Sequence, residues 1–456
     1  MATDATSTTP GTEPTLARRL GLFDATMIVM GGIIGAGIFR NPSVVARTVH
    51  TPSLALTAWV IGGLIALIGA FVYAELAVLR PRVGGQYAYL RDAYHPMVAF
   101  LYGWTLLLVI QTGGMAGVAI VFGDYFREVT GATLPSAWIA VLTLGVLTVI
   151  NCVGVRAGSN VQSGLMVLKI LAIVMLIAVG LFTSHSPAAP SAPRVDSGGF
   201  GGLAGAMVPV LFAYGGWQTS SFVSGEMRNP QRDLPRGLLI GVVGVIVLYL
   251  SVNVVCILVL GMDGLAATST PASEVMRRAL GDGGARLIAI GIAVSGVGFL
   301  SQSMLTAPRV YYAMARDGVF FEKVGWLDPR TRVPTVAIIL QGVFAGIIAL
   351  SGSYDQILNY VESVDMIFFG LTGASLFIFR ARARRSGAAA VEGAHARVPL
   401  HPVTTIIFVL ACWAISLTTI VRSPSHAGVG MAILAIGAVV YLAWRKDPAR
   451  VPANAP

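Results

Sequence analysis

Two long apolar segments of this 456-residue chain are interrupted near their middles by glycine. One interruption falls within residues 27–39 and the other within residues 209–217. Glycine is about 1 kcal/mol less favourable than alanine inside a helix, so each cluster predicts a helix that stops and restarts. The break leaves backbone N–H and C=O groups that lipid cannot satisfy. It is tolerated at membrane depth only where it faces protein or a water-filled cavity.

The composition indicates an all-α integral membrane protein. Hydrophobic residues make up 55% of the chain and charged residues 11%, against about 25% charged in soluble proteins. Apolar stretches of about 20 residues, each long enough to cross a bilayer, repeat along nearly the whole length. We count about twelve transmembrane helices, near residues 22–47, 53–79, 95–122, 134–152, 157–182, 202–223, 237–261, 286–314, 334–352, 355–379, 402–421 and 428–444.

The distribution of charge predicts the orientation of the chain. A net charge of +10 suits nucleic acid, but the basic residues gather in alternate loops between spans. By the positive-inside rule, this pattern places both termini in the cytoplasm of a multi-pass protein of the cell membrane. The predicted organisation is a disordered tail (1–17), a core of ten spans (18–380), a linker (381–401), two further spans (402–446) and a second tail (447–456).

The interrupted spans are the first and the sixth. An offset of five spans is odd, so the second set of five has the opposite orientation in the membrane. The spacing therefore predicts an inverted repeat of five plus five spans followed by two more. Glycine-interrupted spans at matching positions of two such halves indicate a transporter's binding site.

The sequence gives no support to a metal site, a cofactor or an enzyme. Cys152, Cys256 and Cys412 lie in or beside spans without ligand or disulfide spacing, and the six histidines fall in loops or at span ends. A membrane-embedded enzyme would need a nucleophile, base or metal constellation inside the spans, and we find none. A sensor without transport activity has no signalling domain to support it.

Five short motifs stand in order at the matching spans. They are IGAGIF at 34–39, YAEL with PRVGG at 73–85, FAYGGW at 212–217, EMRNP at 226–230 and YAMARDG at 312–318. In these motifs the chain resembles the amino acid–polyamine–organocation (APC) transporters, and within them the bacterial relatives of the L-type amino acid transporters, over about residues 18–445. The resemblance implies the LeuT-type fold with helices 1 and 6 broken.

The two breaks offer complementary chemistry to an amino acid. A restarted helix presents free N–H groups and about +0.5 charge, whereas a helix that stops presents free carbonyls and about −0.5 charge. The N–H groups that we assign to the substrate carboxylate are those of Gly35, Ala36 and Gly37. The carbonyls that we assign to the ammonium are those of Phe212, Ala213 and Gly215. Close helix packing is the other explanation for such glycines, but it does not explain two clustered breaks.

The resemblance implies the same assignment and adds further roles. Phe212 would act as an aromatic gate over the substrate, and Ile33 would line the pocket. Relatives often have serine at the position of Ala36, so carboxylate binding here depends on the backbone alone. Trp217 is expected to wall the side-chain end of the pocket, which would suit small or medium neutral side chains, unless it is an ordinary packing residue.

Lys169 lies near the middle of the fifth span, where a lysine costs at least about 2.5–3.5 kcal/mol. In the family, a lysine here projects toward span one and takes the place of a sodium ion in sodium-coupled relatives. A fixed ammonium would hold the broken span without sodium, and a titrating one would couple transport to protons. The sequence leaves both open, with Ser295 on span eight as a candidate partner.

Glu362 and Asp365 are three residues apart on span ten and share a helix face. Asp365 fits the family pattern, whereas Glu362 departs from it. Glu362 could line an external vestibule, carry a proton or attract a cationic side chain. It could also mark a hydrated helix end near the outer surface.

These features together favour a sodium-independent exchanger of neutral L-amino acids that works by alternating access. The alternative is a proton-coupled symporter on the same fold, with a cationic amino acid or polyamine among its substrates. Animal relatives pair with a glycoprotein through a cysteine in an external loop. No cysteine stands in a comparable loop here, so no accessory subunit is expected.

Overall fold

The computed structural model describes residues 20–80, 84–153, 159–183, 199–329, 331, 333–385 and 397–445. The two predicted tails and most of the predicted linker lie outside these residues. The described chain is helical throughout, with one isolated backbone bridge between Leu20 and Met227. The predicted all-α class is confirmed.

Both predicted interruptions are present. Helix α1 (Leu22–Ile33) ends before a short linker of Ile34, Gly35 and Ala36, and α2 (Gly37–Val49) then begins. Helix α9 (Gly199–Tyr214) ends at Gly215 and Gly216, and the chain continues as a 3₁₀ helix, Trp217–Glu226. Gly216 has a φ of 100°, a left-handed conformation that glycine adopts at no steric cost.

The remaining helices are mostly long. They are α3 (Pro52–Leu79), α4 (Gln86–Ala93), α5 (Pro96–Thr105), α6 (Gln111–Thr130), α7 (Ser136–Cys152), α8 (Ser159–Phe182), α10 (Pro230–Ala267), α11 (Pro271–Thr306), α12 (Pro308–Arg316), α13 (Thr335–Ser351), α14 (Tyr354–Arg385), α15 (Val403–Arg422) and α16 (Pro424–Arg445). Several of them begin with proline, whose missing N–H costs nothing in the first helical turn.

A π-helical stretch, Leu106–Ile110, joins α5 to α6 within one continuous 35-residue run. Such stretches are rare and occur frequently at functional sites. This one ends where Ile110 and Gln111 reach the central cavity described below.

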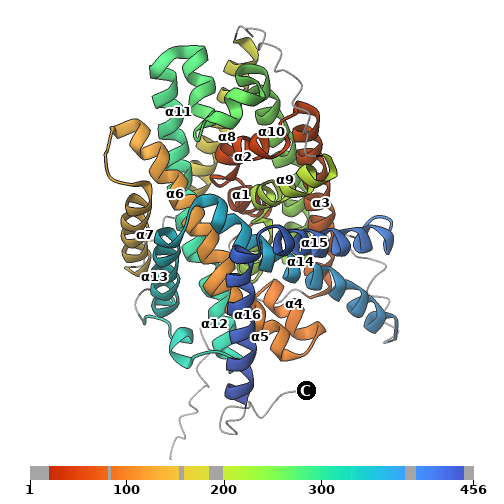
Figure 1. Ribbon diagram of the computed structural model, residues 1–456. Helices are drawn as coiled ribbons and strands as arrows, with labels where there is room; N and C mark the ends of the chain where they lie inside the picture. The colour runs from red at the N-terminus through yellow and green to blue at the C-terminus, as the bar shows by residue number, and fades with distance from the viewer. Residues whose placement is uncertain are drawn as a thin grey trace, which may run out of the picture.

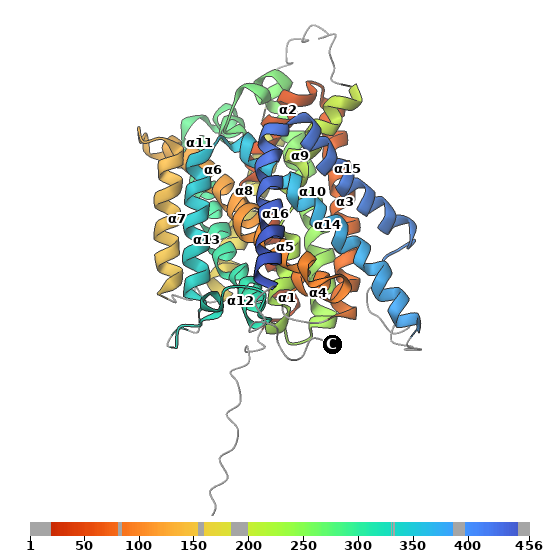
Figure 2. The same cartoon turned by 60° about the horizontal axis from the view of Figure 1, so that its bottom comes forward.

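Eight helical runs in the described residues are long and apolar enough to cross a membrane, and three shorter apolar helices accompany them. Figure 1 shows α2 beside α9, and the two are in contact. In Figure 2 the long helices run roughly alongside one another. Helices α2 and α9 lie toward one end of the bundle, here called the α2 end, and α4 and α12 lie toward the other, the α12 end.

The two breaks touch each other through backbone. A Cβ added at Gly32 would lie 2.5 Å from the Gly216 carbonyl oxygen, and a Cβ at Gly216 would collide with the Gly32 carbonyl. The Thr219 hydroxyl donates to the Gly216 carbonyl at 2.7 Å, and the Tyr249 hydroxyl of α10 donates to the Ile33 carbonyl at 3.0 Å. The end of α1 therefore rests on the turn that follows α9.

This contact predicts that Gly216→Ala destabilises the protein by about 1–3 kcal/mol, because the new methyl group meets backbone and the left-handed φ becomes strained. The apparent Tm of the purified protein in detergent should fall by several degrees. Gly145→Ala on α7 is the matched control, since a Cβ there meets nothing within 4 Å. An unchanged Tm for Gly216→Ala would contradict the contact.

Candidate functional site

A cavity of about 80 Å³ lies between the two breaks. One water needs about 10–15 Å³, so the space holds more than a single water. Every residue that the sequence assigned to substrate binding lines it except Trp217. The lining residues from the breaks are Ile33, Gly35, Ala36, Gly37, Phe212, Ala213 and Gly215.

The backbone groups at the first break do not all remain free. The Gly35 N–H donates to the Ile33 carbonyl at 2.7 Å within the break. Ala36 and Gly37 stand at the start of α2, where helical N–H groups have no intrahelical partner. Ala36 and Gly37 are therefore the main source of free N–H donors at this side of the cavity.

The second break offers the acceptors. Helix α9 ends at Tyr214, so the carbonyls of its last turn lack helical partners. The Phe212 carbonyl accepts a hydrogen bond from the Gly215 N–H at 3.3 Å, but it keeps a second lone pair. The first break thus contributes donors to the cavity and the second break contributes acceptors. A zwitterion requires both kinds of group in one site.

Trp217 lies elsewhere than the sequence suggested. It is 3% exposed and packs edge-on against the Tyr73 ring, with 4.7 Å between centroids. It lines a second, smaller apolar cavity with Phe369 and Phe408. The left-handed Gly216 and the 3₁₀ helix after it turn the indole away from the central cavity.

Five polar residues in the cavity wall were not singled out from the sequence: Gln218, Thr219, Gln302, Ser303 and Thr306. Gln302 donates from Nε2 to the Ile28 carbonyl at 3.1 Å, which ties α11 to α1. Their one signal was the presence of polar side chains inside the apolar stretch 286–314 and directly after the second break.

Glu362 and Asp365 line the cavity from α14. They are 2% and 7% exposed, so the reading of Glu362 as a hydrated helix end is wrong. The helix continues through this position, and Glu362 lies about 12 Å along it from Tyr354. The Glu362 Oε2 atom is buried without a hydrogen-bond partner.

Lys169 of α8 is 4% exposed, and its Nζ donates to the Ile34 carbonyl in the first break. The ammonium is therefore held against the unwound backbone. Ser295 is 3% exposed, and its hydroxyl is buried without a partner, so no hydrogen bond joins it to Lys169. Within the described residues, no group of three or more His, Cys, Asp or Glu side chains is arranged to hold a metal ion.

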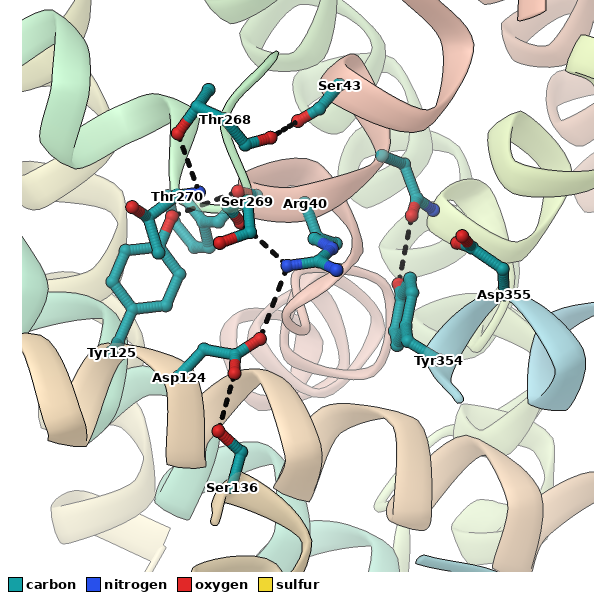
Figure 3. Close-up of polar contacts among 12 residues, drawn as sticks. Arg40, Ser43, Asp124, Tyr125, Ser136, Thr268, Ser269, Thr270, Tyr354 and Asp355 are labelled. Atoms are coloured by element: carbon teal, nitrogen blue, oxygen red, sulfur yellow. Dashed lines mark hydrogen bonds and ion pairs between the residues drawn. The ribbon is translucent and has the colours of Figure 1, made fainter. Parts of the chain in front are cut away.

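Polar contacts at the α2 end tie α2 to its neighbours (Figure 3). Arg40 Nη1 lies 3.2 Å from Asp124 Oδ2 and donates to the Ser269 carbonyl at 3.0 Å. The Ser136 hydroxyl donates to Asp124 at 2.6 Å. Arg40 thus links α2 to α6 and to the connection between α10 and α11.

An aromatic pair lies beside this network, and its member Phe212 lines the cavity. The Phe212 ring meets the Tyr354 ring edge-on, with 6.2 Å between centroids. The Tyr354 hydroxyl donates to Asn41 Oδ1 at 2.9 Å, and Asn41 Nδ2 donates to the Pro209 carbonyl at 2.6 Å. These two hydrogen bonds join α14, α2 and α9, and the Tyr354 ring also contacts Phe212.

Charged contacts hold the α12 end as well. Arg380 of α14 binds Glu75 of α3 through two hydrogen bonds of 2.6 and 2.7 Å, and Glu75 is 1% exposed. The Tyr87 hydroxyl donates to Asp317 at 2.8 Å, and Arg91 forms an ion pair with the same carboxylate. Burial, and then Asp317, raise the pKa of Tyr87, so its hydroxyl stays protonated and can donate.

Comparison with known proteins identifies the family of the chain. Residues 20–442 match the family model for amino acid permeases. The chain is 30% identical to the serine/threonine exchanger SteT of Bacillus subtilis over 443 residues, which is 95% of this chain and 98% of that protein.

The chain belongs to the amino acid permease family of the APC superfamily. It is also 28% identical to the human large neutral amino acids transporter small subunit 2, over 95% of this chain and 82% of that protein. Its identity to the human b(0,+)-type amino acid transporter 1 is 28%, over 80% and 76% respectively. With its eight membrane-capable helical runs, this permease is a multi-pass membrane protein.

The contact of Lys169 with Ile34 predicts a loss of transport in Lys169→Met, because removal of the ammonium leaves a buried carbonyl unpaired. The initial rate of amino acid exchange in proteoliposomes should fall about tenfold or more. Lys323→Met, at an exposed lysine on the α12 side, should leave the rate unchanged. Equal rates in the two variants would contradict a role for Lys169.

The Arg40–Asp124 contact predicts that Asp124→Asn loosens the α2 end. A cysteine placed at Ala36, in a chain whose three native cysteines are replaced, should then react several-fold faster with a soluble thiol reagent. Asp282→Asn is the control, since Asp282 is 85% exposed and pairs with Arg277 at the surface. A labelling rate that Asp124→Asn leaves unchanged would show that this contact does not restrict access.

Proposed function

We propose that this permease is a sodium-independent exchanger of neutral L-amino acids that works by alternating access. The observation that carries the proposal is the single cavity into which the start of α2 and the end of α9 both open. The Ala36 and Gly37 N–H groups would bind the substrate carboxylate, with Gly35 shaping the break. The carbonyls of Phe212, Ala213 and Gly215 would bind the ammonium. A relative named as an exchanger of serine and threonine supports exchange of small amino acids.

Lys169 supports sodium independence. Its ammonium contacts the Ile34 carbonyl, where unwound backbone would otherwise be free to coordinate a cation. A lysine is covalently part of the chain, so this contact would not depend on the sodium concentration. We therefore propose that Lys169 takes the role of a bound sodium ion.

We further propose twelve spans in the LeuT-type arrangement of five plus five with two additional helices. The eight long runs, the three shorter apolar helices and α9 would supply them. The basic residues of the connections at the α12 end, with the positive-inside rule, would make that end and both termini cytoplasmic in the cell membrane. The ion pairs Arg40–Asp124 and Arg380–Glu75 would then belong to the outer and inner closures.

We expect the protein to act without an accessory subunit. One relative is named a small subunit. Here Cys152 is the last residue of α7, and Cys256 and Cys412 lie inside α10 and α15. None of the three stands in a connection that would face an external partner.

Proton-coupled symport is the second candidate, and the buried Glu362 in the cavity wall is the observation that favours it. Uptake of labelled L-alanine and L-leucine into proteoliposomes separates the two in sodium-free buffer. Uptake that requires preloaded amino acid and ignores an inward proton gradient would establish the exchanger. Gradient-driven uptake into empty liposomes would establish symport and contradict exchange.

The open space at Gly114 predicts that a larger side chain there shifts the preference toward smaller substrates. Gly114 lines the cavity, and a Cβ there meets nothing within 4 Å. Gly114→Leu should fill this space and lower the ratio of L-leucine to L-alanine exchange about tenfold, since side-chain contacts of a few carbons are worth 1–3 kcal/mol. Gly145→Leu on α7 has equal room outside the cavity and should leave the ratio unchanged. A matching change in both variants would exclude a pocket at Gly114.

A further inference from the structure

We propose that Glu362 and Asp365 form a subsite for a positively charged group on the substrate side chain. The cavity would then accept L-amino acids with a terminal ammonium as well as neutral ones. This inference rests on the proposed function, because it concerns the side-chain end of the same cavity.

The two carboxylates stand apart from the groups that would bind the amino acid backbone. They belong to α14, whereas the donors and acceptors belong to the breaks of α1–α2 and α9. Being three residues apart, they project from one face of their helix. An ammonium carries three N–H donors, so one such group can bond both carboxylates at once.

The ionisable side chains among the described lining residues of the cavity are both acidic. Among the described residues that line it, Glu362 and Asp365 are the ionisable ones, and no Lys, Arg or His faces them. Neither carboxylate takes part in an ion pair within the described chain, and Lys169 is bonded to the Ile34 carbonyl. Buried charges are normally paired, so a bound cation would stabilise the ionised form of these carboxyl groups.

One carboxyl oxygen of Glu362 has no partner within the described chain. The Glu362 side chain is buried, with an exposed fraction of 2%. Its Oε2 atom has no hydrogen-bond partner. In native structures such atoms are uncommon and require an explanation. A neutral zwitterion that satisfies the two breaks offers this carboxyl group no further donor, whereas a side-chain ammonium would offer it one.

The cavity also has room beside the carboxylates. A Cβ at Gly113 would collide with Val361, so this turn of α6 lies against the turn of α14 that carries Glu362. The next residue, Gly114, opens into the cavity with no atom within 4 Å of its Cβ position. An unbranched side chain can therefore extend along this wall toward α14.

The first experiment uses the wild-type protein in preloaded, sodium-free proteoliposomes at neutral pH. Exchange of labelled L-alanine is measured with L-lysine or L-norleucine as competitor, because norleucine has the same chain without the ammonium. L-lysine should compete about tenfold better than L-norleucine. Competition by norleucine alone would overturn the subsite and leave the proposed exchange of neutral amino acids intact. No exchange of alanine at all would instead overturn the proposed function.

The second experiment tests the residues by the ratio of labelled L-lysine to L-alanine uptake. Glu362→Gln should lower this ratio about tenfold or more, and Asp365→Asn should lower it in the same direction. Asp355→Asn is the matched control, since it removes an exposed carboxylate about two turns earlier on α14. The ratio should stay constant there.

Three results would overturn the subsite. An unchanged ratio in Glu362→Gln would show that the carboxylate does not read the side chain. An equal fall in Asp355→Asn would show a general effect of negative charge on α14. A Glu362→Gln protein that loses only acid-driven uptake of alanine, with its ratio unchanged, would make the group a proton site.

Discussion

The backbone contact between Gly32 and Gly216 is the constraint on which the rest of this structure depends. It brings the end of α1 against the turn after α9, with no room for a side chain on either residue. Because the two helices stop at this contact, the chain must restart on either side of it. The N–H groups at the start of α2 and the carbonyls at the end of α9 therefore belong to residues that line a common space. At membrane depth, interrupted helices of this kind are tolerated because the backbone faces protein and not lipid.

The site has a basic side chain on one side and acidic side chains on another. Lys169 donates a hydrogen bond to the Ile34 carbonyl in the unwound backbone, and we propose that this contact holds the break without a mobile cation. Glu362 and Asp365 of α14 line the cavity with no basic side chain among its described lining residues, and we propose that a substrate ammonium pairs with them. The same helix reaches both ends of the bundle, through Tyr354 at one end and Arg380 at the other. A movement of α14 would therefore change the contacts at both ends of the bundle and the part of the cavity wall that carries Glu362 and Asp365.

The sequence was sufficient for the features that depend on local chain chemistry. Glycine clusters located both breaks to within a few residues, and the depth of Lys169 in its span singled it out. The sequence was insufficient to predict the directions of side chains. The direction of Trp217 depends on the left-handed Gly216 and on a 3₁₀ helix, whose turn differs from that of an α-helix. The depth of Glu362 depends on where α14 begins relative to its neighbours, and Glu75 pairs with Arg380, about 300 residues away. The π-helical stretch before Gln111 has no signal in the apolar run Leu106–Ile110.

The central claim is that opposed helix ends bind the carboxylate and the ammonium of an amino acid without sodium. Calorimetric titration of the purified protein in sodium-free buffer tests it most directly, with L-alanine, ethylamine and propionate as ligands. Each of the last two keeps one of the two charged groups. Binding of L-alanine with loss of binding for both analogues is the predicted result. Equal affinity for L-alanine and either analogue would show that the cavity does not read both groups, and would contradict the claim.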